Sequence, residues 1–131
     1  MVKAKRKFNL IIYNNQYMKE IDLMNLVEKN TNSFLTHPFN SPNKKQNLVH
    51  VYKDNQKGKM IALISQRDGE LFINLKLKPE DVDQLSELKG VERGYHMNKS
   101  NWITIQVNNS EIQKKELINL IRESNDIISN S

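Results

Sequence analysis

The sequence of 131 residues contains no cysteine. This absence excludes disulfide bonds, thiolate metal sites and cysteine nucleophiles, and it suits a reducing compartment, so we expect a cytoplasmic protein. No apolar run approaches the roughly 20 residues that a membrane-spanning helix needs, and we expect no membrane partner. A short apolar run, Phe8–Tyr13, follows the basic N-terminus, but it contains Asn9 and no small-residue cleavage site follows it. We therefore expect no signal peptide.

Glycine is also scarce, with four residues in the chain. None of them belongs to a phosphate-binding loop, a dinucleotide-binding pattern or a nucleophile elbow. The three histidines, His37, His50 and His96, are scattered without the spacing of metal ligands. The acidic stretch from Glu80 to Glu87 fits a solvated helix face. We expect a protein that is not an enzyme and has no catalytic residues, no cofactor and no tightly bound metal.

The net charge of +5 is unevenly distributed. Residues 1–60 contain eleven Lys or Arg and four Asp or Glu, which gives +7, whereas residues 61–131 contain nine and eleven, which gives −2. A basic half suggests a polyanionic partner. However, lysine outnumbers arginine by sixteen to four, and lysine, asparagine and isoleucine codons are rich in A and T. The charge is therefore equally consistent with an AT-rich genome, and both interpretations remain open.

The chain is short enough for a single domain, and we expect a monomer. Residues 1–17 form a basic N-terminal extension, interpreted as a solvated tail or as an arm for nucleic acid, and residues 18–131 form the domain. Phe8–Tyr13 could add a strand to it. A first helix is predicted from Met18 to about Asn30, because Tyr17, Ile21, Met24 and Val27 recur at helical spacing. Residues 31–47 are rich in Asn, Ser, Thr and Pro and indicate a loop.

Strands and helices then alternate with recognisable turn signals. Three strands are predicted at Leu48–Lys53, Lys59–Ser65 and Glu70–Leu77, and Asp68-Gly69 is a strong hairpin signal. Pro79 opens a short helix that Gly90 ends, and Trp102–Val107 alternates as a fourth strand. Ser110 and Gln113 predict a capping box for the last helix. The order α-β-β-β-α-β-α predicts an α+β fold, a twisted and mainly antiparallel sheet of at least four strands with helices on one face.

Strand alternation divides the side chains between two faces. The face toward the helices is expected to hold Leu71, Ile73, Leu75, Leu77, Ile103, Ile105 and Val107. The open face is expected to show Asn74, Lys76, Trp102, Thr104 and Gln106, joined by His50 and Tyr52 from the first strand.

Several short runs resemble the MmcQ/YjbR family, whose fold is related to bacterial frataxin (CyaY). They are Pro38-Phe39, Val51-Tyr52-Lys53, Gly58 to Leu63, Asn74-Leu75-Lys76 with Pro79-Glu80, Gly94 to Lys99 with Trp102, and Ser124. The resemblance covers roughly residues 34–128. This chain departs from the family pattern at Asn101, where a histidine is expected, at Arg93, near which a proline is expected, and at Asn125, where an aromatic residue is usual. The resemblance implies a small α+β domain of poorly defined activity, for which DNA binding through hairpin "wings" has been suggested.

The related frataxin fold also raises iron binding, which needs a concentrated ridge of carboxylates. The first helix offers only Glu20, Asp22 and Glu28 in a net positive half of the chain. We therefore do not expect an iron site.

The segment from His96 to Lys99 has two interpretations. Lys99 could contact phosphate while His96 and Asn98 hydrogen-bond a base or peptide edge. Alternatively the segment is a tight turn in which Asn98 adopts the left-handed conformation and His96 caps a strand end.

Trp102 could be a stacking platform for bases, or it could pair with Tyr52 or Phe72 across the sheet.

Two functions from different classes follow. The first is DNA binding by the basic hairpins and the open sheet face, through Lys53, Lys59, Lys76, His96, Asn98, Lys99 and Trp102. The second is a protein or peptide interaction module that uses the same face. Salt dependence distinguishes them, because counterion release makes nucleic-acid affinity fall steeply with salt.

Overall fold

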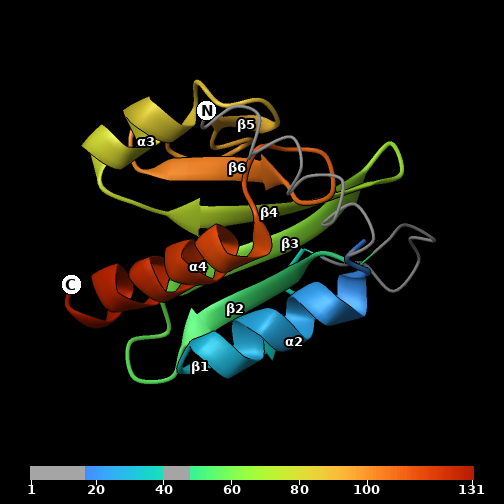
Figure 1. Ribbon diagram of the computed structural model, residues 1–131. Coiled ribbons are helices and arrows are strands. Elements are labelled where there is room, and N and C mark those ends of the chain that lie inside the picture. Colours follow the sequence, from blue (N-terminus) through green and yellow to red (C-terminus); the bar gives the residue numbers. More distant parts are fainter. Residues whose placement is uncertain (1–16, 40–47) are drawn as a thin grey trace.

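The computed structural model describes residues 17–39 and 48–131, which form one antiparallel sheet with helices packed against it. Figure 1 shows helices α2 and α4 side by side on one face of the sheet, with α3 at the end formed by β5 and β6. The predicted α+β class, antiparallel sheet and one-sided helices are confirmed. The predicted strand Phe8–Tyr13 and the basic residues of the N-terminal extension lie outside the described residues.

Three helices and six strands make up the described part of the chain. The helices are α2 (Glu20–Asn30), α3 (Pro79–Leu85) and α4 (Lys114–Ser129). The strands are β1 (Ser33–Thr36), β2 (His50–Asp54), β3 (Met60–Arg67), β4 (Glu70–Lys76), β5 (Val91–Arg93) and β6 (Trp102–Gln106). Within these residues no helix is long and apolar enough to cross a membrane.

The sheet order is β1-β2-β3-β4-β6-β5, and every neighbouring pair is antiparallel. The predicted hairpin between β3 and β4 is confirmed, because Asp68 and Gly69 both have positive φ, as a two-residue type I′ turn requires. The predicted order α-β-β-β-α-β-α omitted β1 and β5, the two edge strands. They have four and three residues, too few for alternation to reveal them, and β1 lies in the segment that was predicted as a loop.

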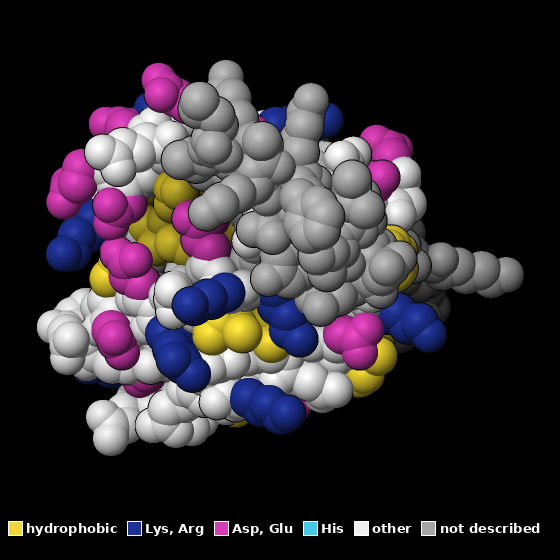
Figure 2. Space-filling model, in the orientation of Figure 1, with side chains coloured by type: hydrophobic (Ala, Val, Ile, Leu, Met, Phe, Trp, Pro, Cys, Tyr) yellow, Lys and Arg dark blue, Asp and Glu magenta, His cyan; other side chains and the backbone are white. Residues whose placement is uncertain are grey.

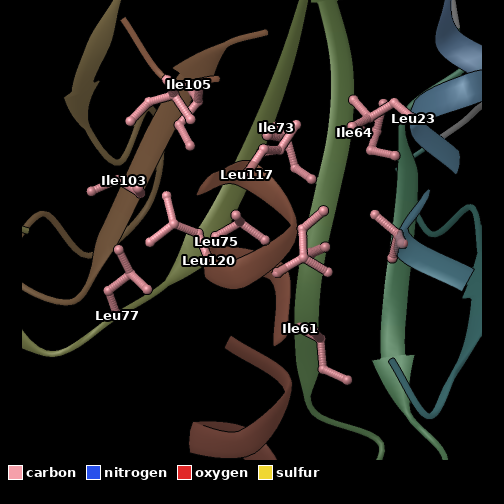
Figure 3. Packing of buried hydrophobic residues seen from close by; sticks show 14 of the residues in the cluster. Leu23, Ile61, Ile64, Ile73, Leu75, Leu77, Ile103, Ile105, Leu117 and Leu120 are labelled. Atoms are coloured by element: carbon pink, nitrogen blue, oxygen red, sulfur yellow. The ribbon is translucent and has the colours of Figure 1, made fainter. Parts of the chain in front are cut away.

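The core lies between the sheet and the two long helices. Figure 3 shows Ile73 and Leu75 of β4 and Ile103 and Ile105 of β6 gathered around α4, which contributes Leu117 and Leu120. These side chains match the apolar face that strand alternation predicted. Most of them are fully buried, and each buried aliphatic side chain contributes about 1.5–3 kcal/mol to folding.

Helix α2 faces the core with only part of the predicted apolar stripe, because Val27 and Met24 pack there and Leu23 joins them. Leu23 and Val27 are fully buried, whereas Tyr17 and Ile21 are 69% and 56% exposed. The helix begins at Glu20, and the Asp22 carboxylate accepts the backbone N–H of Lys19 there. The apolar spacing therefore identified the helix, but only its second half, Met24 and Val27, belongs to the buried side.

Strand β2 also turns a different side to the helices from the one predicted. His50 and Tyr52 were expected on the open face, but both are buried beneath α2, and Val51 lies on the opposite side. The Tyr52 hydroxyl donates to Glu28 Oε2 at 2.7 Å. Burial, followed by the hydrogen bond to Glu28 and its charge, raises the pKa of Tyr52 well above its usual value. His50 and Tyr52 can face α2 because Glu20 and Glu28 of this helix contact their polar atoms. The prediction that only the apolar side of β2 faces the helices is therefore wrong.

The turn after β2 is held by Asp54. Its Oδ2 accepts the backbone N–H groups of Gln56 and Lys57, and its Oδ1 accepts the Ser129 hydroxyl. The hydrogen bond from the Lys57 backbone is the main reason that the pKa of Asp54 is lowered. This turn leads directly into β3 and fixes its register against β2.

Ser124 of α4 joins two strands at the point where they separate. The last paired residues of β3 and β4 are Ala62 and Leu75, so the next register position would pair Ile61 with Lys76. The buried Ser124 hydroxyl stands there instead, because it donates to Ile61 O at 2.7 Å and accepts Lys76 N–H at 3.0 Å. One side chain thereby satisfies two buried backbone groups.

The predicted capping box of the last helix is wrong. Helix α4 begins at Lys114 after Gln113, and Ser110 Oγ instead accepts the backbone N–H of Ile112 in the preceding turn. The residue spacing matched a capping box, but the helix starts four residues after Ser110 and its N-cap is Gln113.

Helix α3 contacts α4 through two carboxyl groups. Glu123 forms a side-chain hydrogen bond with Asp81, and burial, followed by this bond and the Asp81 charge, raises the pKa of Glu123. The folded protein therefore holds this proton at a higher pH than the unfolded chain does. The resulting stabilisation is complete below the ordinary pKa of glutamate and is lost as the pH rises through the raised pKa.

A Glu123→Gln variant should consequently be more stable than the parent protein at pH 7, by about 0.2–0.5 kcal/mol, because it removes a like-charge pair. The gain should disappear near pH 4, where Glu123 is itself protonated. Urea denaturation at several pH values measures both. Glu116→Gln, in the first turn of the same helix, is the control and should give no gain, since Glu116 complements the helix N-terminus. An equal gain at both pH values would contradict this account.

Candidate binding groove on the open sheet face

The open face of the sheet carries a row of side chains in register across three strands. Leu63 of β3 pairs with Asn74 of β4, which pairs with Thr104 of β6. Thr104 Oγ1 donates to Asn74 Oδ1 at 2.7 Å and accepts the backbone N–H of Tyr95 at 2.8 Å. Asn74 Nδ2 lies 3.4 Å from Tyr95 O. This network is nearly buried and fixes the position of the segment that follows β5.

A groove of about 430 Å³ opens above this row. Its described lining residues are Phe39, Val49, Met60, Leu63, Ser65, Gln66, Arg67, Asn74, Tyr95, His96, Met97 and Thr104. Most of the surface they present is apolar, and the polar lining residues include Asn74 and Thr104, which the network above holds in place. A groove of this size, apolar with a few fixed polar groups, is typical of a ligand-binding site.

Aromatic and cationic side chains form part of the rim. The Arg67 guanidinium lies 4.0 Å from the centre of the Phe72 ring and 3.8 Å from that of Tyr95, and it also pairs with Glu92 at 2.7 Å. Tyr95 remains 41% exposed and Phe39 61% exposed. The rim therefore presents aromatic surface to solvent while Arg67 keeps Tyr95 in place.

The segment from Gly94 to Trp102 is a turn built by its own side chains. Lys99 Nζ donates to Gly94 O at 2.9 Å, and Asn98 Oδ1 accepts the backbone N–H of Ser100. The left-handed residue is His96, at φ 60°, and not Asn98 as predicted. The segment is thus a turn, as the structural interpretation supposed, but Asn98 and Lys99 hold it together by their side chains and His96 lines the groove instead of capping a strand.

Trp102 is on the open face, as predicted, but only 8% exposed. Its cross-strand partner is Lys76, so the predicted pairings with Tyr52 or Phe72 are wrong. A β-carbon added at Gly94 would lie 2.7 Å from Trp102 Cβ, which shows how closely the turn lies against this side chain. A tryptophan this buried has little ring surface left for stacking on bases.

The three predicted lysines of the sheet do not form one patch. Lys53 and Lys76 lie at the same end of the open face, with strand β3 between them. Lys59 instead directs its Nζ to the Ser131 hydroxyl at 3.3 Å, beside the end of α4. The structure therefore places Lys76 beside Trp102 and puts Lys53 at the same end of the open face, whereas the Lys59 side chain is directed to the end of α4.

On the face of the molecule that the helices cover, acidic and basic side chains lie in different areas. Figure 2 shows acidic side chains gathered at the α3 side and Lys and Arg side chains around α4 and α2. These basic side chains therefore lie on the face that the helices cover, on the opposite side of the sheet from Lys53 and Lys76.

A family model described as YjbR matches residues 34–127, which include the groove and every strand except the start of β1. The chain belongs to the YjbR family. The resemblance drawn from the sequence is thereby confirmed. Some of the residues that carried it, including Phe39, Asn74 and the Gly94–Lys99 segment, lie around the groove or hold its rim in place.

Relatives of this YjbR domain have little functional description. It is 39% identical over 57 residues to the uncharacterized protein YyaQ of Bacillus subtilis, a match over 43% of this chain and 48% of YyaQ. It is 37% identical over 68 residues to the uncharacterized protein YbdF of Escherichia coli O157:H7, over 51% of this chain and 55% of YbdF. The matches thus span about half the length of these curated relatives.

Solved structures show the same fold. A crystal structure of a Pseudomonas syringae protein superposes with a TM-score of 0.71 at 26% identity, covering 85% of this chain and 99% of that one. A Deinococcus radiodurans protein with a DUF419 domain gives a TM-score of 0.65, also at 26% identity, over 84% and 78% of the two chains. The YjbR domain described here therefore has the architecture of this family.

Sequence reasoning found part of the groove of the YjbR domain. Strand alternation placed Asn74 and Thr104 on the open face, which is confirmed, and the segment containing His96 was singled out. Arg67, Tyr95 and Met60 were not proposed as site residues. Their role depends on the turns around β3 and after β5, and no alternation pattern in the sequence describes how a turn folds back over a sheet.

Proposed function

We propose that this YjbR domain is a non-enzymatic binding module whose open sheet face accepts a peptide segment of a partner protein. The observation that carries the proposal is the composition of the groove. Its apolar walls contain Met60, Leu63 and Met97, and its rim contains Phe39, Tyr95 and Arg67. Aromatic residues, methionine and arginine are the residue types that protein interfaces favour.

A peptide matches the chemistry of the groove better than a nucleic acid does. Apolar side chains of a peptide would fill the space over Leu63, and Asn74 and Thr104 hold the Tyr95 rim beside it in place. Of the residues first considered for DNA binding, Lys99 is bonded to Gly94 O, Lys59 is directed toward Ser131, and Trp102 is buried. The proposal keeps the expectation of a monomeric, cytoplasmic protein that needs no cofactor.

The test is selection of peptides from a random phage-displayed library on the full chain, followed by calorimetry with the selected peptides. Leu63→Glu places a charge in the groove and should weaken peptide binding at least tenfold, because the carboxylate would be desolvated by an apolar ligand. Leu35→Glu is the matched control, since Leu35 of β1 is 37% exposed and does not line the groove. It should leave binding unchanged.

Nucleic acid is examined in the same experiment with labelled single- and double-stranded oligonucleotides at several salt concentrations. Peptide binding should change little with salt. Binding of oligonucleotides with a steep salt slope, flattened by about 1.8 units in a Lys53→Ala, Lys76→Ala double variant on duplex DNA, would favour DNA binding instead. Peptides that bind Leu63→Glu as tightly as the parent protein would show that the groove is not the site.

A further inference from the structure

Two histidines that are 13 residues apart in the sequence meet at the β1 end of the sheet. His37 follows β1 and His50 begins β2, and His37 Nε2 lies 2.9 Å from His50 Nδ1. The two rings meet edge to face, with centres 5.0 Å apart. His37 is exposed, whereas His50 is only 4% exposed. Two imidazole nitrogens thus meet at the edge of the buried region, on the helix side of the sheet.

The other nitrogen of His50 faces a carboxylate. His50 Nε2 lies 3.2 Å from Glu20 Oε1 of α2, but it has no well-aligned hydrogen-bond partner and is fully buried. Glu20 is held in turn, because its Oε2 accepts an N–H of Gln66 at 2.9 Å. Four side chains therefore contact one another in a row from the sheet to the solvent. They are Gln66, Glu20, the buried His50 and the exposed His37.

This order of groups is the one found behind metal-binding histidines. A histidine that binds a metal through one nitrogen nearly always donates its other N–H to a carboxylate or carbonyl, and that carboxylate is itself hydrogen-bonded. Glu20 faces His50 Nε2 and favours the tautomer with the proton on that nitrogen, so that the lone pair is on Nδ1. In the structure this lone pair accepts the N–H of His37. It can bind a metal when the exposed His37 takes its other neutral tautomer and offers its own Nε2 lone pair. Two histidines that only contact each other would not need the Glu20 carboxylate beside His50 or the Gln66 amide that holds this carboxylate.

We propose that His37 Nε2 and His50 Nδ1 bind a divalent metal ion of the class that prefers imidazole, such as Zn²⁺ or Cu²⁺, with Glu20 positioning His50. Two nitrogens at about 2.0–2.1 Å from a tetrahedral Zn²⁺ are separated by about 3.3 Å. The present separation of 2.9 Å needs only a small movement of the exposed His37 side chain to reach this value.

Water completes the coordination of the ion. Within residues 17–39 and 48–131 no group of three or more His, Cys, Asp or Glu side chains could hold a metal, so these residues supply two ligands and the site stays open. Such a site exchanges its ion readily, and it is compatible with the expectation that the protein has no tightly bound metal. By the usual order of stability, Cu²⁺ should bind more tightly than Zn²⁺.

The test is calorimetric titration of Zn²⁺, and separately of Cu²⁺, into the full chain in a buffer that does not bind metals. One equivalent should bind to the parent protein and to His96→Ala, because His96 lies on the opposite face of the sheet. His37→Ala changes an exposed residue and should weaken binding at least tenfold, as should His50→Ala. Glu20→Gln should weaken metal binding by about tenfold to a hundredfold. This is the effect expected for a residue that contacts a metal-binding histidine and not the metal itself.

A second measurement covers the case in which His50→Ala fails to fold. In the parent protein, Zn²⁺ should shift the imidazole NMR resonances of His37 and His50 and leave those of His96 unchanged. Binding by His37→Ala as tight as that of the parent protein, an equal loss in His96→Ala, or no saturable binding would overturn the proposal. None of these outcomes bears on the peptide groove, because its lining residues exclude His37, His50 and Glu20.

Discussion

Replacing Ser124 by alanine is expected to lower the free energy of unfolding by about 2–4 kcal/mol. The substitution leaves two buried backbone groups, Ile61 C=O and Lys76 N–H, without the hydroxyl that bonds both. Each unsatisfied buried group costs about 1–3 kcal/mol. A domain of this size has only about 5–15 kcal/mol of stability, so the loss should be plain in urea denaturation followed by the fluorescence of Trp102, the single tryptophan.

Ser129 of the same helix provides the control for this variant. Its hydroxyl also makes one hydrogen bond, to Asp54 Oδ1 at 3.1 Å, but the residue is exposed and water can replace the bond. Ser129→Ala should therefore cost about 0.5–1.5 kcal/mol at most. Equal losses in the two variants would mean that Ser124 does not join β3 and β4 in the way described.

Replacing Gly90 by alanine is expected to cost about 3 kcal/mol. Gly90 has φ +78°, which a residue with a side chain adopts at a cost of about 1–2 kcal/mol. In addition, the new β-carbon would lie 2.3 Å from the backbone oxygen of Asn109 and 2.6 Å from Ser110 Cα. Backbone atoms cannot move aside as a flexible side chain can, so overpacking adds about 1–3 kcal/mol.

The same substitution at Gly69 separates these two causes. Gly69 has nearly the same φ, +79°, but an added β-carbon would meet nothing within 4 Å. Gly69→Ala should therefore cost only the 1–2 kcal/mol of its backbone conformation, and urea denaturation of both variants measures the difference. If the two variants were equally stable, the segment before β5 would not be packed against the β6–α4 connection as the structure shows.

The sequence alone determined the class of the fold and the placement of its long central strands. Alternation in β4 and β6 correctly assigned the buried face of Ile73, Leu75, Ile103 and Ile105, and Asp68-Gly69 identified the hairpin. These features depend on neighbouring residues along one strand or turn, and their cause is local. The family resemblance was visible for the same reason, because its runs are short and contiguous.

The prediction that His50 and Tyr52 lie on the open face was wrong because the side of a strand that faces a helix depends on the side chains of that helix. Glu20 and Glu28 of α2 provide partners for these two polar side chains, so they are buried and Val51 is turned to the other side. Alternation fixes which residues of a strand share a face, but it does not state which face is covered. Only the packing of α2 on the sheet decided this.

Both proposed sites likewise depend on contacts between distant segments. The groove needs the turn after β5 to lie against the sheet through Thr104 and Tyr95, and the histidine pair needs β1 beside β2. Strand β1 has four residues and no sequence pattern of its own. The sequence thus indicated the chemical groups of each site and one stretch of the groove rim. The tertiary structure decided which of these groups meet, because the pairing of strands far apart in the chain is fixed by packing and not by local propensity.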